Sequence, residues 1–487
     1  MARIARESVR AALVLSAVCC AVGLSAIPAA ALVPLPEYVT FVQDGALKQV
    51  SGGDTAAAVL VDPWSLPADG PEFAAPLEVV GHWWAPDGTH VAVGVRDASG
   101  ESGRLFICDD NGASPVQVMA WEGTYWLDPA APEWTGPELV WSPDGSRLAL
   151  TIFEYEPVFG DIFAVELDGT ASLVGAGVDP AWSPDGTYLA YTRAVAGAAE
   201  VDESQPYVGV GDVVSGEYVE LGVGRMPVFS PDGSQVLYKT WVEDPGTGMA
   251  PEQLVVAPAA GGEGRMLTAF GPFDDLGAAA EIWSYQFSPD GSKAYFMLGR
   301  RSDWRYVWEV PTDGSGEPVM VSGLATEFTL SPDGTRLVYT SGEIYDGNYQ
   351  TRQQVYARDL ASCAEWQLSP ATVAAEACQA PSVSHRNRYV AFDVHVLTDP
   401  GNRTSIERRD VWIATLDGSH TWQVATGAYD AQCQPMYRFA GEGEDASGNG
   451  DDVGPMDDES DSSRTGVFAR IGDAVASFFR WLAGLFD

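Results

Sequence analysis

The stretch Trp182-Ser183-Pro184-Asp185-Gly186 is followed directly by the apolar run Tyr188–Thr192, and this pair of features recurs along the chain. Near-identical copies of the pentapeptide begin at Trp84, Trp141, Phe229, Phe287 and Leu330. A repeat roughly every 40 to 60 residues is typical of a β-propeller, in which each repeat forms one four-stranded blade. The repeats therefore predict an all-β fold.

Residues 179–222 show how one repeat forms a blade. We expect a short first strand, A, at 180–183, and strand B at 188–192, joined by the Pro-Asp-Gly turn. Proline presets φ, aspartate bonds its own backbone and glycine tolerates a positive φ, so this tripeptide is well suited to a tight turn. Strands C and D follow at 207–212 and 218–221, which completes an antiparallel meander.

Two further observations set the number of blades. A seventh, degenerate repeat runs from Pro381 to Phe392 and ends with 410–418. Two fragments remain: 38–50, which we interpret as strands C and D, and 434–439, which we interpret as strand A. Together they would form a closing blade that leaves no open sheet edge. We predict eight blades over residues 38–440; seven blades with the chain ends packed on the rim is the alternative.

The repeated pentapeptide resembles the WD40-like repeat of TolB-type propellers, which also occurs in the propeller halves of prolyl oligopeptidase-like enzymes. The resemblance covers residues 79–427 and implies the fold, whereas propellers host unrelated activities. TolB itself carries an α/β domain before its propeller, and the stretch 32–78 is too short for one.

The repeated residues themselves are expected to be structural. We expect the Trp or Phe before each Ser-Pro-Asp-Gly to pack between blades. The six turn aspartates are expected to cap their own turns: Asp87, Asp144, Asp185, Asp232, Asp290 and Asp333.

Residues 1–31 have the pattern of a signal peptide. Three arginines precede an uncharged run from Ala11, and Ala29-Ala30-Ala31 is a small-residue cleavage pattern. The charge-free run 11–33 is also long enough to be an uncleaved anchor. We expect an exported protein that is extracellular, periplasmic or associated with the cell surface.

Export permits disulfides, and Cys363 and Cys378 flank one connector between blades, so they are the disulfide candidate. No cysteine pair has the spacing of a zinc site. With 27 Lys and Arg against 68 Asp and Glu, the net charge is −41, which disfavours nucleic acid as a partner.

The longest segments between predicted strands are the B–C loops and the D–A connectors, which share one face of a propeller. Variation gathered on one face of a rigid scaffold is typical of a binding surface. The most aromatic connector carries the candidate ligand-binding residues Trp121, Tyr125, Trp126 and Trp134. Exposed, they would bind an envelope protein, a peptide or a glycan; alternatively, they fold back and cover the mouth of the ring.

Sequence motifs of enzymes are missing. The chain has no Gly-x-Ser-x-Gly elbow, no His-Glu-x-x-His pair and no phosphate-binding glycine loop. We therefore predict no catalytic residue, no metal and no cofactor, and a non-catalytic binding or scaffold module. The alternative is a propeller lyase or hydrolase with a central pocket, in which His82 and His385 from nearby blades would share a metal site.

The C-terminal region changes composition abruptly. Residues 441–465 are rich in Gly, Ser and acidic residues, which predicts a disordered linker. Residues 466–487 have the apolar periodicity of an amphipathic helix. Its apolar stripe consists of Phe468, Ile471, Val475, Phe478, Phe479, Leu482 and Leu485. We expect this helix to contact a membrane surface or a partner, with packing on its own propeller as a further alternative.

Overall fold

The computed structural model describes thirteen segments of the chain, which alternate with segments outside the description. They are residues 37–51, 56–67, 77–97, 102–122, 139–152, 160–193, 206–243, 250–271, 280–299, 305–345, 349–370, 376–398 and 406–435. The chain divides into two units, 1–438 and 439–487, and every described residue belongs to the first. The predicted signal peptide, acidic linker and C-terminal helix lie outside the described residues.

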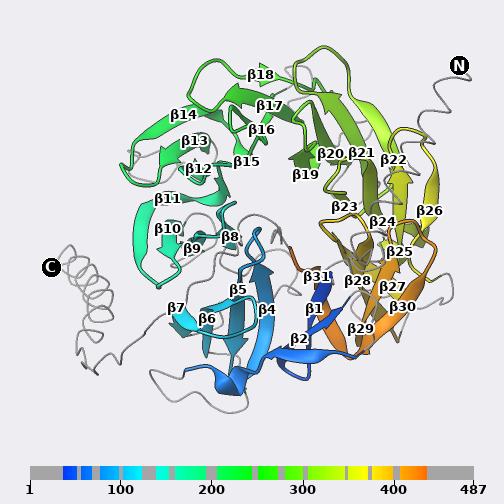
Figure 1. Ribbon diagram of the computed structural model, residues 1–487. Coiled ribbons are helices and arrows are strands. Elements are labelled where there is room, and N and C mark those ends of the chain that lie inside the picture. Colours follow the sequence, from blue (N-terminus) through cyan, green and yellow to red (C-terminus); the bar gives the residue numbers. More distant parts are fainter. Residues whose placement is uncertain are drawn as a thin grey trace, which may run out of the picture. The chain divides into compact units, whose positions relative to one another are not determined.

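The described residues form a ring of antiparallel sheets (Figure 1), which is a β-propeller of eight four-stranded blades. Blade 1 consists of β4(Glu78–Trp84), β5(His90–Arg96), β6(Ser102–Asp109) and β7(Val116–Glu122), and blade 2 of β8(Leu139–Trp141), β9(Arg147–Ile152), β10(Gly160–Glu166) and the first half of β11(Ala171–Trp182). Blade 3 consists of the second half of β11 with β12(Tyr188–Arg193), β13(Tyr207–Asp212) and β14(Tyr218–Val223). Blade 4 consists of β15(Arg225–Phe229), β16(Gln235–Trp241), β17(Glu252–Pro258) and β18(Arg265–Met266). Blades 5 to 7 consist of β19(Glu281–Phe287), β20(Lys293–Gly299), β21(Arg305–Pro311), β22(Val319–Leu324); β23(Glu327–Leu330), β24(Arg336–Tyr345), β25(Tyr349–Asp359), β26(Glu365–Gln367); and β27(Glu376–Val383), β28(Tyr389–Leu397), β29(Ile406–Thr415), β30(Thr421–Thr426).

Strand β11 serves two blades. Its first half pairs with β10 as the outer strand of blade 2, and its second half pairs with β12 as the inner strand of blade 3. The two blades therefore form one continuous seven-stranded sheet. No connector separates them, because the chain passes directly from one blade into the next.

The eighth blade joins the two ends of the described chain. It has the order β3(Ala58–Val61), β2(Ala46–Ser51), β1(Tyr38–Gln43), β31(Ala428–Cys433), and Figure 1 shows β31 beside β1. The register pairs Val39 with Cys433 and Gln43 with Ala428. This corrects two assignments: β1 and β2 are strands B and C rather than C and D, and strand A is 428–433 rather than 434–439. Strand D of this blade, β3, is not among the strands expected from the sequence.

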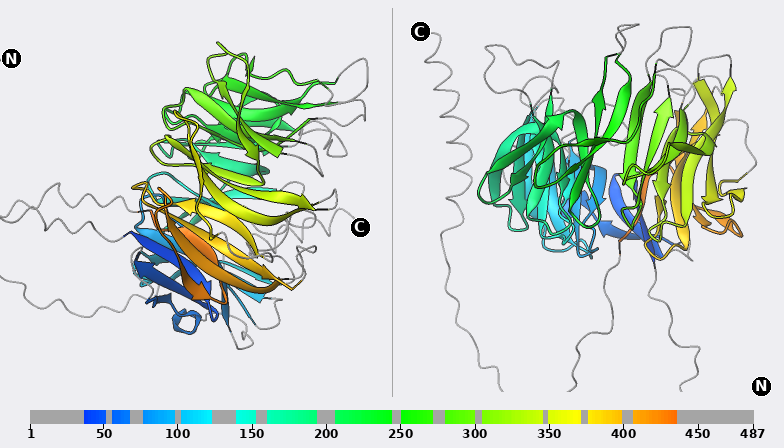
Figure 2. Two further views of the ribbon diagram at one scale, coloured as in Figure 1. Left: turned by 90° about the vertical axis from the view of Figure 1, so that its right-hand side faces the viewer. Right: turned by 90° about the horizontal axis from the view of Figure 1, so that it is seen from above.

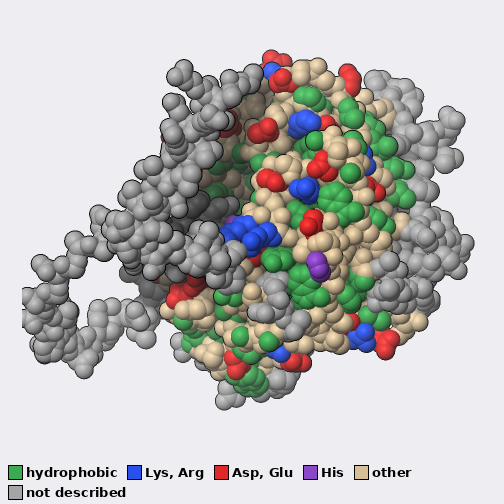
Figure 3. Space-filling model, turned by 45° about the vertical axis from the view of Figure 1, so that its right-hand side comes forward, with side chains coloured by type: hydrophobic (Ala, Val, Ile, Leu, Met, Phe, Trp, Pro, Cys, Tyr) green, Lys and Arg blue, Asp and Glu red, His purple; other side chains and the backbone are tan. Residues whose placement is uncertain are grey.

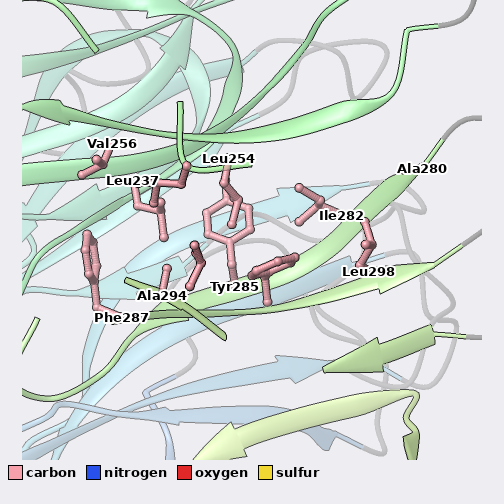
Figure 4. Packing of buried hydrophobic residues seen from close by; sticks show 12 residues of the cluster. Leu237, Leu254, Val256, Ala280, Ile282, Tyr285, Phe287, Ala294 and Leu298 are labelled. Carbon is pink, nitrogen blue, oxygen red and sulfur yellow. The ribbon is translucent and has the colours of Figure 1, made fainter. Parts of the chain in front are cut away.

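The core of the ring consists of eight hydrophobic clusters, and each of them bridges two neighbouring blades, including the pairs 7–8 and 8–1. Figure 4 shows one of them, where Leu237 and Leu254 of blade 4 meet Tyr285 and Phe287 of blade 5. The apolar residue before each Ser-Pro-Asp-Gly (or Ala-Pro-Asp-Gly) belongs to such a cluster: Trp84, Trp141, Trp182, Phe229, Phe287 and Leu330. Because stability comes from contacts between blades, closure of the ring by the eighth blade completes the core.

The strands run between the two faces of the ring, as the side views of Figure 2 show. One face, here called the tight-turn face, carries the A–B and C–D connections. The A–B connection has five residues in all seven repeats, as in 183–187 and 230–234. The opposite, long-loop face carries the B–C and D–A connections, among them 62–77, 123–138 and 267–280. The described chain begins and ends side by side on the tight-turn face, where the Gln434 N–H donates to the Tyr38 carbonyl (2.9 Å).

Candidate functional site

The predicted aromatic binding site lies almost entirely outside the described residues. Trp121 is in β7, where it pairs with Gly103 of β6, at the end of the strand from which the connector 123–138 begins. Tyr125, Trp126 and Trp134 belong to that connector. The apolar stripe predicted for the C-terminal helix is likewise outside the described residues.

The turn aspartates are held by short-range hydrogen bonds. In five repeats the serine hydroxyl donates to the aspartate two residues later at 2.6 Å, as Ser288 does to Asp290. The same carboxylate accepts the backbone N–H of Ser292 (3.0 Å), and Asp87 accepts that of Thr89 (3.0 Å). Hydrogen bonds from Ser288 and Ser292 hold the pKa of Asp290 at about 2. A carboxylate with its acceptors occupied in this way stabilises a turn.

Tryptophans of the repeats also link one blade to the preceding one by a hydrogen bond. The indole N–H of Trp141 donates to the carbonyl of Trp83, and that of Trp182 to the carbonyl of Val140, both at 2.9 Å. Each bond joins the inner strand of one blade to that of its predecessor. The indole thus has two roles, packing between blades and fixing their relative position.

One constellation resembles a catalytic triad, at the junction of blades 7, 8 and 1. The imidazole of His82 lies 2.7 Å from Thr40 Oγ1 through Nε2 and 2.7 Å from Asp430 Oδ2 through Nδ1. The Trp84 indole N–H donates to Thr40 Oγ1 (2.8 Å), and the backbone N–H of His82 donates to Asp430 (3.1 Å). We call Thr40, His82, Trp84, Asp393 and Asp430 the closure network.

Asp393 of the closure network is buried and the side chain of Asp430 is 11% exposed, and the pKa values of the two carboxyls move in opposite directions. Burial raises the pKa of Asp393 to about 7, although its oxygens accept the backbone N–H groups of Asp430 (2.8 Å) and Ala431 (3.0 Å). Burial also opposes ionisation of Asp430, but the neighbouring charge and hydrogen bonds of His82 outweigh it and lower the pKa. Asp430 has a φ of 60°, which turns its backbone towards Asp393.

In the closure network a hydroxyl, an imidazole and a carboxylate follow one another as in a catalytic triad, but a substrate has no access to them. Thr40 and His82 are both 0% exposed, and each polar atom of the imidazole already has a partner. A general base must reach the proton of a bound substrate. The arrangement therefore acts as a clasp for ring closure. The sequence does not indicate it, because His82 and Asp430 are 348 positions apart.

His82 and His385 do not share a site. His82 is enclosed by Thr40 and Asp430, whereas His385 lies in the A–B turn of blade 7, where burial lowers its pKa. Within the described segments, no group of three or more His, Cys, Asp or Glu side chains is arranged to hold a metal ion.

The predicted Cys363–Cys378 disulfide is wrong, since neither residue is in a disulfide. Cys363 is exposed in the β25–β26 turn on the tight-turn face. Cys378 is buried near the start of β27, at the long-loop end of its blade, in the cluster between blades 6 and 7. The length of a strand separates the two, more than a disulfide spans.

One side of the described part of the ring is seen in Figure 3. In the view of Figure 3, acidic and basic side chains are interspersed among apolar and other side chains. No helix in the part of the chain that the structure describes is long and apolar enough to cross a membrane.

The order of its strands in the sheets defines the chain as a β-propeller. No protein-family model matches the chain, and no curated protein does. Among solved structures it is similar to TolB from Acinetobacter baumannii, with 16% identity, 69% of this chain and 80% of that chain covered, and a TM-score of 0.36.

Two enzymes match the chain with sequence identities, coverages and TM-scores of similar size. Oligogalacturonate lyase from Vibrio parahaemolyticus has 13% identity, with 74% of this chain and 93% of that chain covered and a TM-score of 0.44. Dipeptidyl peptidase 4 from Porphyromonas gingivalis has 11% identity, with 73% and 55% covered and a TM-score of 0.48. Similarity at such low identity and TM-score carries no activity over to this chain.

Proposed function

We propose that this chain is an exported, envelope-associated β-propeller that binds a partner through its long-loop face without catalysing a reaction. The observation that supports the proposal is the division of connections between the two faces. The tight-turn face repeats one five-residue turn in seven repeats, whereas segments such as 62–77 and 123–138 all leave from the opposite face. Long connections on one face of a rigid scaffold are the usual form of a recognition surface.

The scaffold has the rigidity that such a surface needs. Eight buried clusters join every pair of neighbouring blades, and the closure network ties blades 7, 8 and 1 together. The ends of the long connections are therefore held at fixed positions, which limits the entropy lost on binding. The partner class that fits the aromatic connector 123–138 is an envelope protein, a peptide or a glycan.

The test compares three forms of the full chain on an array of envelope glycans and peptides. In one form, Gly and Ser of equal number replace 123–138 on the long-loop face. In the matched control, Gly and Ser replace 110–115, the C–D turn of the same blade on the tight-turn face. We expect the first form to lose the ligand and the second to retain it. Equal binding by both forms would contradict the proposal.

The enzyme alternative has its own readout in the same experiment. Each bound ligand is incubated with the chain, with and without a divalent metal, and the products are analysed by mass spectrometry. Cleavage that needs the metal and disappears in the His385→Ala variant would favour a lyase or a hydrolase. Binding without cleavage, unchanged in that variant, is the expected result.

A further inference from the structure

We propose that a groove between blades 3 and 4, on the tight-turn face, is a docking site for a short basic peptide that carries an aromatic side chain. The groove has a volume of about 650 Å³. This is within the range of sites that enclose ligands, about 300–1,000 Å³. It lies on the face opposite to the long loops, so this proposal stands or fails independently of the proposed function.

The groove exists because a side chain that fills the two preceding boundaries, between blades 1 and 2 and between blades 2 and 3, is missing here. The first residue of strand B is His90 in blade 1, which stacks on Trp141 with ring centroids 6.5 Å apart. In blade 2 it is Arg147, whose guanidinium lies 5.4 Å from the ring centre of Trp182 and donates to the carbonyl of Gly186 (2.9 Å).

In blade 3 the equivalent residue is Tyr188, which is 40% exposed and lines the groove. The aromatic residue opposite it, in blade 4, is Phe229 instead of a tryptophan. The far wall consists of small residues, Gly233, Ser234 and Ala259 among them. The boundary between blades 3 and 4 therefore contains an open space, whereas the side chain of Arg147 fills the equivalent space between blades 2 and 3.

The walls of the groove combine apolar surface with negative charge. Tyr188, Val210, Val219 and Phe229 supply the apolar part, and Val219 is 41% exposed. Four carboxylates also line it, those of Asp185, Asp212, Glu217 and Asp232, whereas no Lys or Arg is among the lining residues.

Three of these carboxylates, those of Asp185, Asp212 and Asp232, are preorganised as anions. Hydrogen bonds from Ser183 lower the pKa of Asp185, and those from Ser230 lower that of Asp232. Backbone N–H groups of Ser215 and Val214 do the same for Asp212. Because the turns already fix these side chains, a cationic ligand meets charges that need no rearrangement.

The chemistry of the groove selects its occupant. An aromatic side chain fits between the walls of Tyr188 and Phe229, in the place that Arg147 and Trp182 fill at the preceding boundary. Lys or Arg on either side of it would pair with the carboxylates. A polyamine matches the charge but leaves the apolar walls uncovered, and phosphate-bearing ligands are repelled.

The probe is the fluorescein-labelled pentapeptide Lys-Arg-Trp-Arg-Lys, and its binding to the full chain is measured by fluorescence anisotropy at 0.15 M salt. Tyr188→Arg copies the arrangement of blade 2 and should fill the groove. Glu217→Lys reverses one charge in its wall. The matched control is Glu220→Lys, which changes the net charge equally at an exposed residue of β14 that does not line the groove.

We expect the first two variants to raise the Kd at least tenfold and Glu220→Lys to change it less than twofold. A peptide with Gly in place of Trp should also bind at least tenfold more weakly. Circular dichroism and the melting temperature of each variant establish that it is folded. Equal loss in all three variants would overturn the proposal, since diffuse attraction to a chain of net charge −41 would then explain binding. Displacement of the peptide by spermidine at equal concentration, or no binding below millimolar peptide, would also overturn it.

Discussion

Replacing Thr40 by valine tests the clasp that closes the ring. Thr40→Val keeps the volume of the side chain but removes the hydroxyl that contacts His82 Nε2 (2.7 Å) and Trp84 Nε1 (2.8 Å). The Nε2 atom of His82 and the Nε1 atom of Trp84 would then be buried without a hydrogen bond, since His82 is 0% and Trp84 7% exposed. Each such group costs about 1–3 kcal/mol, and loss of the buried hydroxyl itself offsets part of the sum. We therefore expect a destabilisation of about 2–4 kcal/mol.

The matched control is Thr40→Ser, which keeps the hydroxyl and removes one methyl group, at a cost of about 1 kcal/mol. Unfolding in urea is followed by tryptophan fluorescence and by far-UV circular dichroism. Coincident transitions are needed before the midpoints are converted to free energies. If the valine and serine variants are equally stable, the hydroxyl does not hold the closure network together and the reasoning is refuted.

Other groups of the ring give two further predictions. Iodoacetamide should alkylate the exposed Cys363 in the native protein, whereas the buried Cys108, Cys378 and Cys433 should react only in denaturant. Peptide mapping identifies the alkylated residues. An unreactive Cys363 would contradict its assignment as an exposed thiol. The pKa of Asp393 rises from an ordinary value of 3.8 to about 7 in the fold, so its stabilising contribution is complete below pH 3.8 and is lost as the pH rises through about 7. The stability of the native chain relative to Asp393→Asn should therefore increase as the pH falls from 8 to 5, by at most about 1.4 kcal/mol per pH unit; a pH-independent difference would show that the carboxyl is not perturbed.

The repeating part of this fold is predictable because its interactions are local. Ser183 bonds Asp185 only two residues away, and the turn places Trp182 on one strand and Tyr188 on the next. One pentapeptide thus carries the information for two strands and the turn between them. The same locality predicts both the period and the packing position of the aromatic residue.

Features that depend on distant residues escaped prediction. The sequence predicts the closing strand at 434–439 because nothing local distinguishes it from 428–433, and the choice depends on pairing with β1 almost four hundred positions away. The sequence predicts the blade that begins at 179, but not that one continuous strand, β11, runs through this blade boundary. The groove beside Tyr188 follows from which residue faces it across a blade boundary, and the sequence period alone does not reveal that.

The central claim is that the two ends of the described chain meet in one blade, which makes the ring a rigid support for its long loops. Val39 of β1 and Cys433 of β31 are register partners and belong to one cluster. Partner Cα atoms on antiparallel strands lie about 4.5–5.5 Å apart, within the range of a disulfide. The Val39→Cys variant, refolded from urea in an oxidising glutathione buffer, is digested with trypsin and its peptides are identified by mass spectrometry.

The account predicts one disulfide-linked peptide that joins residue 39 to Cys433. The control is Val42→Cys, whose partner is Tyr429 and whose side chain packs in the cluster on the other side of the blade. It should yield no such peptide. A Val39→Cys variant that refolds with both thiols free, or equal cross-linking by the control, would contradict closure of the ring by its two ends.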